Sequence, residues 1–194
     1  MWDLYRSHPS FVLGFHGCAQ DIGEAVIRGE VTHLQESRND HDWLGNGIYF
    51  WEGSPQRALE WATQRKKAKP FVVGAIIDLG FCCNLADRAS LDELRQAYSQ
   101  FKSLQAALGL KLPKNEGKPP DRLWRRRDRA VIEYMHQFRE YGADLPRYDT
   151  VRSPFTEGKS LYPGAGFKSK NHIQIAVRST SCIKGYFRPI AQRL

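Results

Sequence analysis

Short apolar runs and longer segments of helical periodicity follow one another along the chain. Runs that are rich in β-branched and aromatic residues, and that are bounded by glycine, proline or polar residues, predict strands. The predicted strands cover residues 11–15, 47–51, 71–78, 172–178 and 182–187. In the second strand, alternation places Ile48 and Phe50 on one face and Tyr49 and Trp51 on the other.

Apolar residues spaced three and four positions apart predict four helices between these strands. Ser54-Pro55 supplies an N-cap and a first-turn proline for the second helix. The sequence Ser90-Leu91-Asp92-Glu93 predicts a capping box at the start of the third helix, and Gly109 predicts its end. The first and fourth helices are predicted over residues 21–28 and 128–139, the fourth with Val131, Tyr134, Met135 and Phe138 turned inward.

Polar segments rich in glycine and proline predict loops over residues 35–46, 111–121 and 152–170. The first and the last are long for a compact domain, so they are candidates for a functional role. Strands and helices do not alternate regularly, which favours the α+β class over a doubly wound sheet. With 194 residues, of which 41% are hydrophobic, the chain is predicted to form one domain over residues 1–194.

The overall charge indicates the chemistry of the partner. The formal net charge is +8 at pH 7 and the isoelectric point is near 9.4, which favours a polyanion or a substrate that carries a pyrophosphate. Cys18, Cys82, Cys83 and Cys182 show no metal-binding spacing and are expected to be reduced and buried. No leader is predicted at residues 1–6 and no apolar run reaches the ~18 residues of a membrane span, so a cytoplasmic protein without membrane contact is expected.

Two short motifs carry the main functional signal. Phe15-His16-Gly17 ends the first predicted strand, and Gly45-Asn46-Gly47-Ile48-Tyr49-Phe50 leads into the second, about thirty residues later. In order, spacing and following helix, this pair resembles the first two nicotinamide-site motifs of the ADP-ribosyltransferases. The resemblance is to the His-Tyr-Glu class, which includes poly-ADP-ribose polymerases and diphtheria-type toxins. It implies a split, strongly bent β-sheet with peripheral helices, and NAD as a substrate.

The resemblance also implies roles for individual residues. His16 would hydrogen-bond a ribose hydroxyl, while the backbone of Gly17 would meet the nicotinamide amide and Tyr49 would stack on the nicotinamide ring. Trp61 is a second candidate for stacking, with a place in the core as its alternative. Phe15, Gly47 and Phe50 flank these positions and complete the predicted NAD-binding set.

The third motif of that class, a glutamate on a late strand, is absent. The predicted late strand places Gln174 at the corresponding position, with His172 two residues earlier on the same face. A glutamine can hydrogen-bond a ribose hydroxyl but cannot act as a general base, which speaks against polymer elongation. Glu157 precedes the strand and is a candidate for a catalytic carboxylate that reaches in from the loop, with an ordinary exposed glutamate as the alternative.

Basic residues supply the candidates for substrate binding. Arg125, Arg126 and Arg127 follow Trp124, a composition typical of nucleic-acid contacts, although a solvated helix start is an equal alternative. Arg152 is a candidate for binding the pyrophosphate with paired hydrogen bonds. The loop histidines, His33 and His41, are expected to be solvated, and no metal site is predicted.

The sequence therefore predicts a mono-ADP-ribosyltransferase that uses NAD, modifies a macromolecule and releases nicotinamide. Nucleic acid is slightly favoured over protein as the acceptor. By analogy with toxins and defence effectors of this kind, an antitoxin is a candidate partner. Two alternatives stay open: an NAD-dependent RNA 2′-phosphotransferase, and a non-catalytic RNA-binding module on a decayed transferase fold.

Overall fold

The computed structural model describes residues 11–65, 69–119, 121–142 and 145–190. The segment over residues 1–6, for which no leader is predicted, lies outside this range. Within the described residues the chain is a mixed α+β structure with one seven-stranded sheet and four α-helices. The prediction of an α+β fold is confirmed at this level.

The sheet is mostly antiparallel and has the order β4-β5-β6-β2-β1-β3-β7. Only β4 and β5 run parallel, and every other neighbouring pair is antiparallel. The strands are β1 (Val12–Ala19), β2 (Ile48–Glu52), β3 (Pro70–Ile77), β4 (Cys82–Asn84), β5 (Thr150–Phe155), β6 (His172–Val177) and β7 (Ile183–Phe187).

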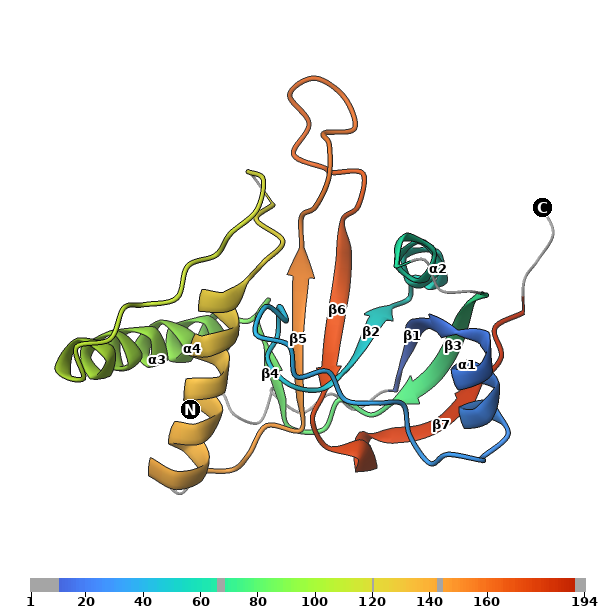
Figure 1. Cartoon of the computed structure of the whole chain (residues 1–194), viewed down its shortest axis with the longest axis horizontal. Helices are drawn as coiled ribbons and strands as arrows, with labels where there is room; N and C mark the ends of the chain where they lie inside the picture. Colours follow the sequence, from blue (N-terminus) through green and yellow to red (C-terminus); the bar gives the residue numbers. More distant parts are fainter. Residues whose placement is uncertain (1–10, 66–68, 120, 143–144, 191–194) are drawn as a thin grey trace.

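The sheet opens between its two central strands. β1 pairs with β3 along its whole length, but it pairs with β2 only at Gly14↔Glu52 and Phe15↔Trp51. Beyond Phe15 the two strands separate. Figure 1 shows β5 and β6 upright at the centre, while β1, β3 and β7 turn away across the molecule. The separation leaves the residues after Phe15 beside a gap in the ladder, where side chains can reach between strands.

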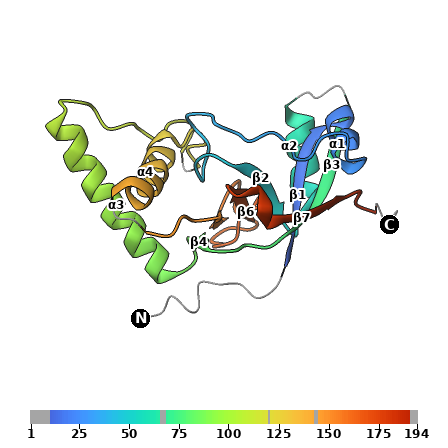
Figure 2. The ribbon, with the colours of Figure 1, turned by 90° about the horizontal axis from the view of Figure 1, so that it is seen from below.

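The four helices cover opposite ends of the sheet. α1 (Gln20–Ile27) and α2 (Pro55–Gln64) pack on β1 and β3, whereas α3 (Arg88–Ala107) and α4 (Arg126–Gln137) pack on each other beside β4 and β5. The view from below in Figure 2 separates these two groups clearly. Two apolar clusters lie on opposite faces of the sheet, because alternate residues of β6 divide between them: Ile175 and Val177 belong to the cluster around Phe50 and Val73, and Ala176 belongs to the cluster around Ile132 and Val151.

Helix α2 lies unusually close to β1. A Cβ on Gly17 would lie 2.1 Å from the backbone oxygen of Ala58, so the absence of a side chain at Gly17 is required by the packing of this helix. Phe15, Trp51 and Ala58 form a small buried cluster at the same contact. This contact fixes α2 over the place where β1 and β2 part.

Some local predictions were wrong. α3 begins at Arg88 rather than at the predicted capping box, because the carboxylate of Asp87 accepts a hydrogen bond from Ser90 N (3.1 Å) and caps the helix earlier. Part of the predicted loop 152–170 belongs to β5, which pairs with β4 and β6. Phe138 lies in the π-helical turn after α4 and is 39% exposed instead of buried.

Other expectations were confirmed. Ile48 and Phe50 are buried in the core, as the alternation of β2 predicts. Gly109 follows α3 with φ of +67°, the left-handed conformation that ends a helix. All four cysteines are buried thiols. Among the described residues, none of the helices combines the length and the hydropathy that a membrane crossing requires.

Candidate functional site

A cavity of about 510 Å³ opens where β1 and β2 separate. Its walls come from both halves of the sheet, from α2 and from the loop over residues 35–46. The lining brings together five of the residues that the sequence singles out: His16, Tyr49, Trp61, Glu157 and Gln174. Its other members are Gln35, Ser37, Asn39, His41, Asp42, Trp43, Trp51, Arg57, Gln64, Arg65 and Leu123.

His16 bridges the gap between the two strands. Its Nδ1 donates a hydrogen bond to the backbone oxygen of Tyr49 (2.8 Å). Because the partner is a carbonyl, Nδ1 carries the proton and the orientation of the ring is fixed. The ring also contacts Phe50 edge-on, with centroids 5.9 Å apart. His16 therefore takes the place of a ladder hydrogen bond at the opening of the cavity.

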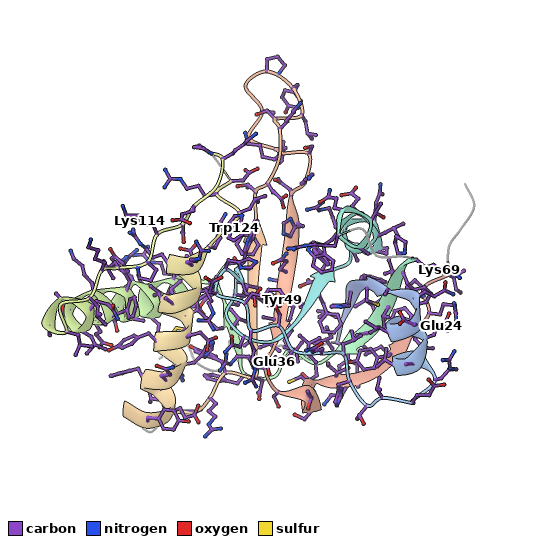
Figure 3. The ribbon with its side chains drawn as sticks, viewed as in Figure 1. Glu24, Glu36, Tyr49, Lys69, Lys114 and Trp124 are labelled. Carbon is purple, nitrogen blue, oxygen red and sulfur yellow. The ribbon has the colours of Figure 1, made fainter. Side chains whose placement is uncertain are left out.

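Tyr49 has a ring that lines the cavity and a hydroxyl that anchors a loop. The hydroxyl donates to the oxygen of Gly45 (2.7 Å) and accepts from the nitrogen of Leu44 (2.8 Å). Burial raises the pKa of Tyr49 well above its ordinary value, so the hydroxyl stays protonated. Figure 3 labels this residue near the middle of the molecule. The hydroxyl holds the end of the loop over residues 35–46, and the ring remains as a wall.

Two tryptophans form a second aromatic wall. The rings of Trp51 and Trp61 lie 6.0 Å apart at 52°. The sequence offers Trp61 either a stacking role or a place in the core, and the structure combines them. The Trp61 ring packs against the small buried cluster and also lines the cavity. The guanidinium of Arg65 lies 5.3 Å over the Trp61 ring. The wall therefore ends in a positive charge.

A buried donor and a buried acceptor lie on neighbouring positions of β2 and β6. Trp51 and Gln174 are register partners on these strands. Among the described residues, neither Trp51 Nε1 nor Gln174 Oε1 has a hydrogen-bond partner. Each such buried atom costs about 1–3 kcal/mol. Both atoms are closed to solvent, so a ligand in the cavity that offers an acceptor and a donor would satisfy them after the two side chains turn toward it.

Glu157 is buried in the wall of the cavity, so the alternative of an exposed loop glutamate does not apply. It is 9% exposed. Its carboxylate lies 3.0 Å from an Arg57 nitrogen and 3.8 Å from Lys170 Nζ. Arg57 comes from α2, so this ion pair ties the loop after β5 to the helix over the cavity.

His172 lies behind Glu157 and does not line the cavity. Its Nδ1 donates to the oxygen of Lys170 (2.7 Å) and lies 3.8 Å from the Glu157 carboxylate. Burial, with the nearby charge of Arg57, lowers the pKa of His172 below its ordinary value. The ring packs between Trp43 and Phe155. It lines a second groove of about 740 Å³, which also contains Glu52, Ser54, Arg125, Pro154, Phe155, Thr156, Asn171 and Ile173.

The predicted substrate-binding arginines are largely engaged with other parts of the chain. Arg125 stacks on Trp43, 4.5 Å from the ring centre. Arg126 bonds Asp40 (2.7 Å), and Arg127 bonds the oxygen of Pro113 (2.8 Å). These contacts hold the loops over residues 35–46 and 111–121 to the start of α4.

The remaining predicted site residues lie around the cavity without lining it. Arg152 is bonded through two nitrogens to the carboxylate of Glu52 (2.6 and 2.9 Å). Phe15 and Phe50 are core residues. A Cβ on Gly47 would lie 2.9 Å from the oxygen of Val177, so this glycine lets β2 approach β6.

Several lining residues carry no motif in the sequence. Arg57 has the helical spacing of a surface residue, and only its ion pair with Glu157 places it at the cavity. Asp42 fixes the loop by accepting from Ser37 Oγ (2.7 Å) and Asn39 N (2.8 Å). No group of three or more histidine, cysteine, aspartate or glutamate side chains in the described chain is arranged to hold a metal ion.

Comparison with known proteins gives no function. No family model matches the chain, and no solved structure matches it significantly. The chain is similar to the Uncharacterized protein MJ0359 of Methanocaldococcus jannaschii, with 25% identity over 188 residues. The alignment covers 88% of this chain and 83% of that protein. The similarity thus extends over most of both chains, and the name of that protein states no activity.

Proposed function

We propose that this chain is an NAD-dependent mono-ADP-ribosyltransferase that modifies a macromolecule and releases nicotinamide. The observation that carries the proposal is the cavity in the split sheet. It combines aromatic walls with an unsatisfied donor and acceptor, Trp51 Nε1 and Gln174 Oε1. These are the groups that a nicotinamide riboside requires, since it has a flat ring, a carboxamide and ribose hydroxyls.

The size and the shape of the cavity support this ligand. A volume of about 510 Å³ lies in the range typical of small-molecule sites. Tyr49, Trp51 and Trp61 offer ring faces for nicotinamide. Gln174 Oε1 would accept from a ribose hydroxyl, which removes the cost of an unsatisfied acceptor. Arg65, at the end of the aromatic wall, would meet the pyrophosphate.

The reaction requires stabilisation of a positive charge. As the bond between ribose C1′ and the nicotinamide nitrogen breaks, its electron pair leaves with nicotinamide and the ribose becomes oxocarbenium-like. A carboxylate fixed nearby stabilises this charge more in the transition state than in the ground state. Glu157 is a carboxylate in the lining, held by Arg57 and Lys170. It would supply the charge that Gln174 lacks.

The acceptor completes the reaction. Its nucleophilic atom attacks C1′ and loses a proton, which Glu157 would receive before it passes to solvent. Gln174 positions the ribose but takes no proton, because an amide is not a base at neutral pH. That only one ADP-ribose is transferred is part of the proposal and rests on the glutamine at position 174, where the resemblance expects a glutamate. Action in the cytoplasm, as a toxin or defence effector, is part of the proposal and rests on the resemblance of the sequence alone.

Nicotinamide release from NAD by the purified protein, with and without total cellular RNA, tests the proposal. Release by the wild type should fall at least about tenfold in His16→Ala and in Trp61→Ala, as expected for lost positioning and stacking groups. His33→Ala is the matched control, since His33 contacts Tyr186 outside the cavity. Equal release by the wild type and both cavity variants would refute the proposal.

A further inference from the structure

The loop between β5 and β6 projects from the body of the molecule as an ordered hairpin. Figure 1 shows it extending beyond all the strands. Its two arms are joined by backbone hydrogen bonds from Ser169 N to Lys159 O (2.8 Å) and from Leu161 N to Phe167 O (3.1 Å). Ser160 and Lys168 form an isolated bridge between them. The backbone therefore presents the side chains of the hairpin in fixed positions.

The tip of this hairpin carries large apolar side chains that are open to solvent. Leu161, Tyr162 and Phe167 are 60%, 57% and 63% exposed. Leu161 and Phe167 lie opposite each other across the arms. A cluster of this kind on a projecting, ordered segment is typical of a contact surface.

Positive charge flanks the apolar tip. The arms contribute Lys159 and Lys168, whereas Lys170 lies 3.8 Å from the buried carboxylate of Glu157, which also pairs with Arg57. The exposed part of the hairpin is thus basic and aromatic. At its base lies the second groove, with the donors Ser54, Arg125 and Asn171 in its lining.

This composition fits single-stranded nucleic acid. Unpaired bases stack on exposed aromatic rings and the backbone phosphates pair with lysine and arginine, whereas the bases of a duplex are already stacked. The tip is close to the cavity, because Leu161 is four residues from Glu157 and an extended chain of that length spans at most about 14 Å. The groove and the cavity are lined by the adjacent residues Thr156 and Glu157, so a strand held at the tip and in the groove lies near the wall of the cavity.

We infer that the hairpin over residues 156–171 and the groove at its base bind single-stranded nucleic acid, which is the acceptor of the transferase. That the bound strand is the acceptor of a transfer reaction rests on the proposed function. The binding surface is inferred from the exposed side chains and the positive charge of the hairpin, so binding and catalysis can be tested separately.

The experiment measures the fluorescence anisotropy of labelled single-stranded RNA and DNA over a salt series. The strands have about ten nucleotides, a length within the usual site size. The matching duplex is measured in the same way. We expect the single strands to bind more tightly than the duplex. Phosphate contacts from Lys159 and Lys168 predict a contribution of about −1.4 to the slope of log K against log salt, and Lys159→Gln with Lys168→Gln should remove it. Tyr162→Ala with Phe167→Ala should weaken binding at least about fivefold.

Matched controls lie on the far side of the molecule. Tyr141, in the turn after α4, is 79% exposed, and Lys102 is exposed on α3. Tyr141→Ala and Lys102→Gln should leave anisotropy unchanged. A melting curve with NAD checks each hairpin variant, and an unchanged shift with NAD shows that the fold and the cavity are intact.

The outcomes separate the two proposals. Salt-dependent binding that the hairpin variants lose, with the NAD shift retained, supports the inference. If RNA binds in this way but NAD has no effect, the surface is supported and the transferase proposal fails. Equal binding by hairpin variants and controls overturns the inference, as does a hairpin-dependent modification of protein without any binding of nucleic acid.

Discussion

Replacing Gln174 by leucine should stabilise the free protein and abolish NAD binding. Gln174 Oε1 is buried without a partner in the described chain, which costs about 1–3 kcal/mol. Leucine has a similar volume and needs no partner. With only part of that cost recovered, the net gain in unfolding free energy should be about 1 kcal/mol. For a domain of this size that is a rise of about 2–4 °C in Tm.

The assay is thermal and urea unfolding with and without NAD. NAD at about one hundred times its Kd should add about 2.7 kcal/mol to the wild type and nothing to Gln174→Leu. Gln137→Leu is the control, because Gln137 is exposed on α4 and its replacement should change stability by less than about 0.5 kcal/mol. A loss of about 2 kcal/mol or more in Gln174→Leu, or an unchanged effect of NAD, would refute the reasoning.

Three further perturbations follow from the packing. Gly17→Ala should destabilise by about 1–3 kcal/mol in urea unfolding, because its Cβ would lie 2.1 Å from Ala58 O; a neutral result would contradict the close packing of α2. Tyr49→Phe should cost about 1–2 kcal/mol by leaving Leu44 N without its acceptor, yet keep the NAD shift in Tm; loss of that shift would assign the hydroxyl to the ligand. Burial lowers the pKa of His136 from 6.5 to about 3. The unfolded chain therefore takes up a proton at a higher pH than the native chain, so stability is complete above pH 6.5 and falls toward pH 3. That cost is about 2 kcal/mol at pH 5, and His136→Leu should flatten this part of a Tm–pH curve; an unchanged curve would show that another group is responsible.

Local signals in the sequence were sufficient to predict the elements that frame the cavity. The apolar run before His16 predicts β1, and the turn before Tyr49 predicts β2, because both depend on side chains that are close in sequence. Ser54-Pro55 correctly predicts the start of α2. These elements bring His16, Tyr49 and Trp61 to one cavity.

Residues that depend on distant partners could not be placed in this way. Glu157 and Arg57 are 100 residues apart, and so are Arg152 and Glu52. The ion pair with Arg57 holds Glu157 in the lining of the cavity, and the ion pair with Glu52 holds Arg152 outside it. β4 has three residues, and its pairing with β5 is fixed by contacts across more than sixty residues of chain. No local pattern carries such information.

The most direct test is a parallel count of nicotinamide released and ADP-ribose attached to RNA in one reaction, by chromatography and by mass spectrometry of the RNA. The account predicts equal amounts of the two products for the wild type and at least about tenfold less of both for Trp61→Ala, with His33→Ala unaffected. An NAD pool that stays intact with every acceptor, and that leaves the Tm of the wild type unchanged, would contradict it.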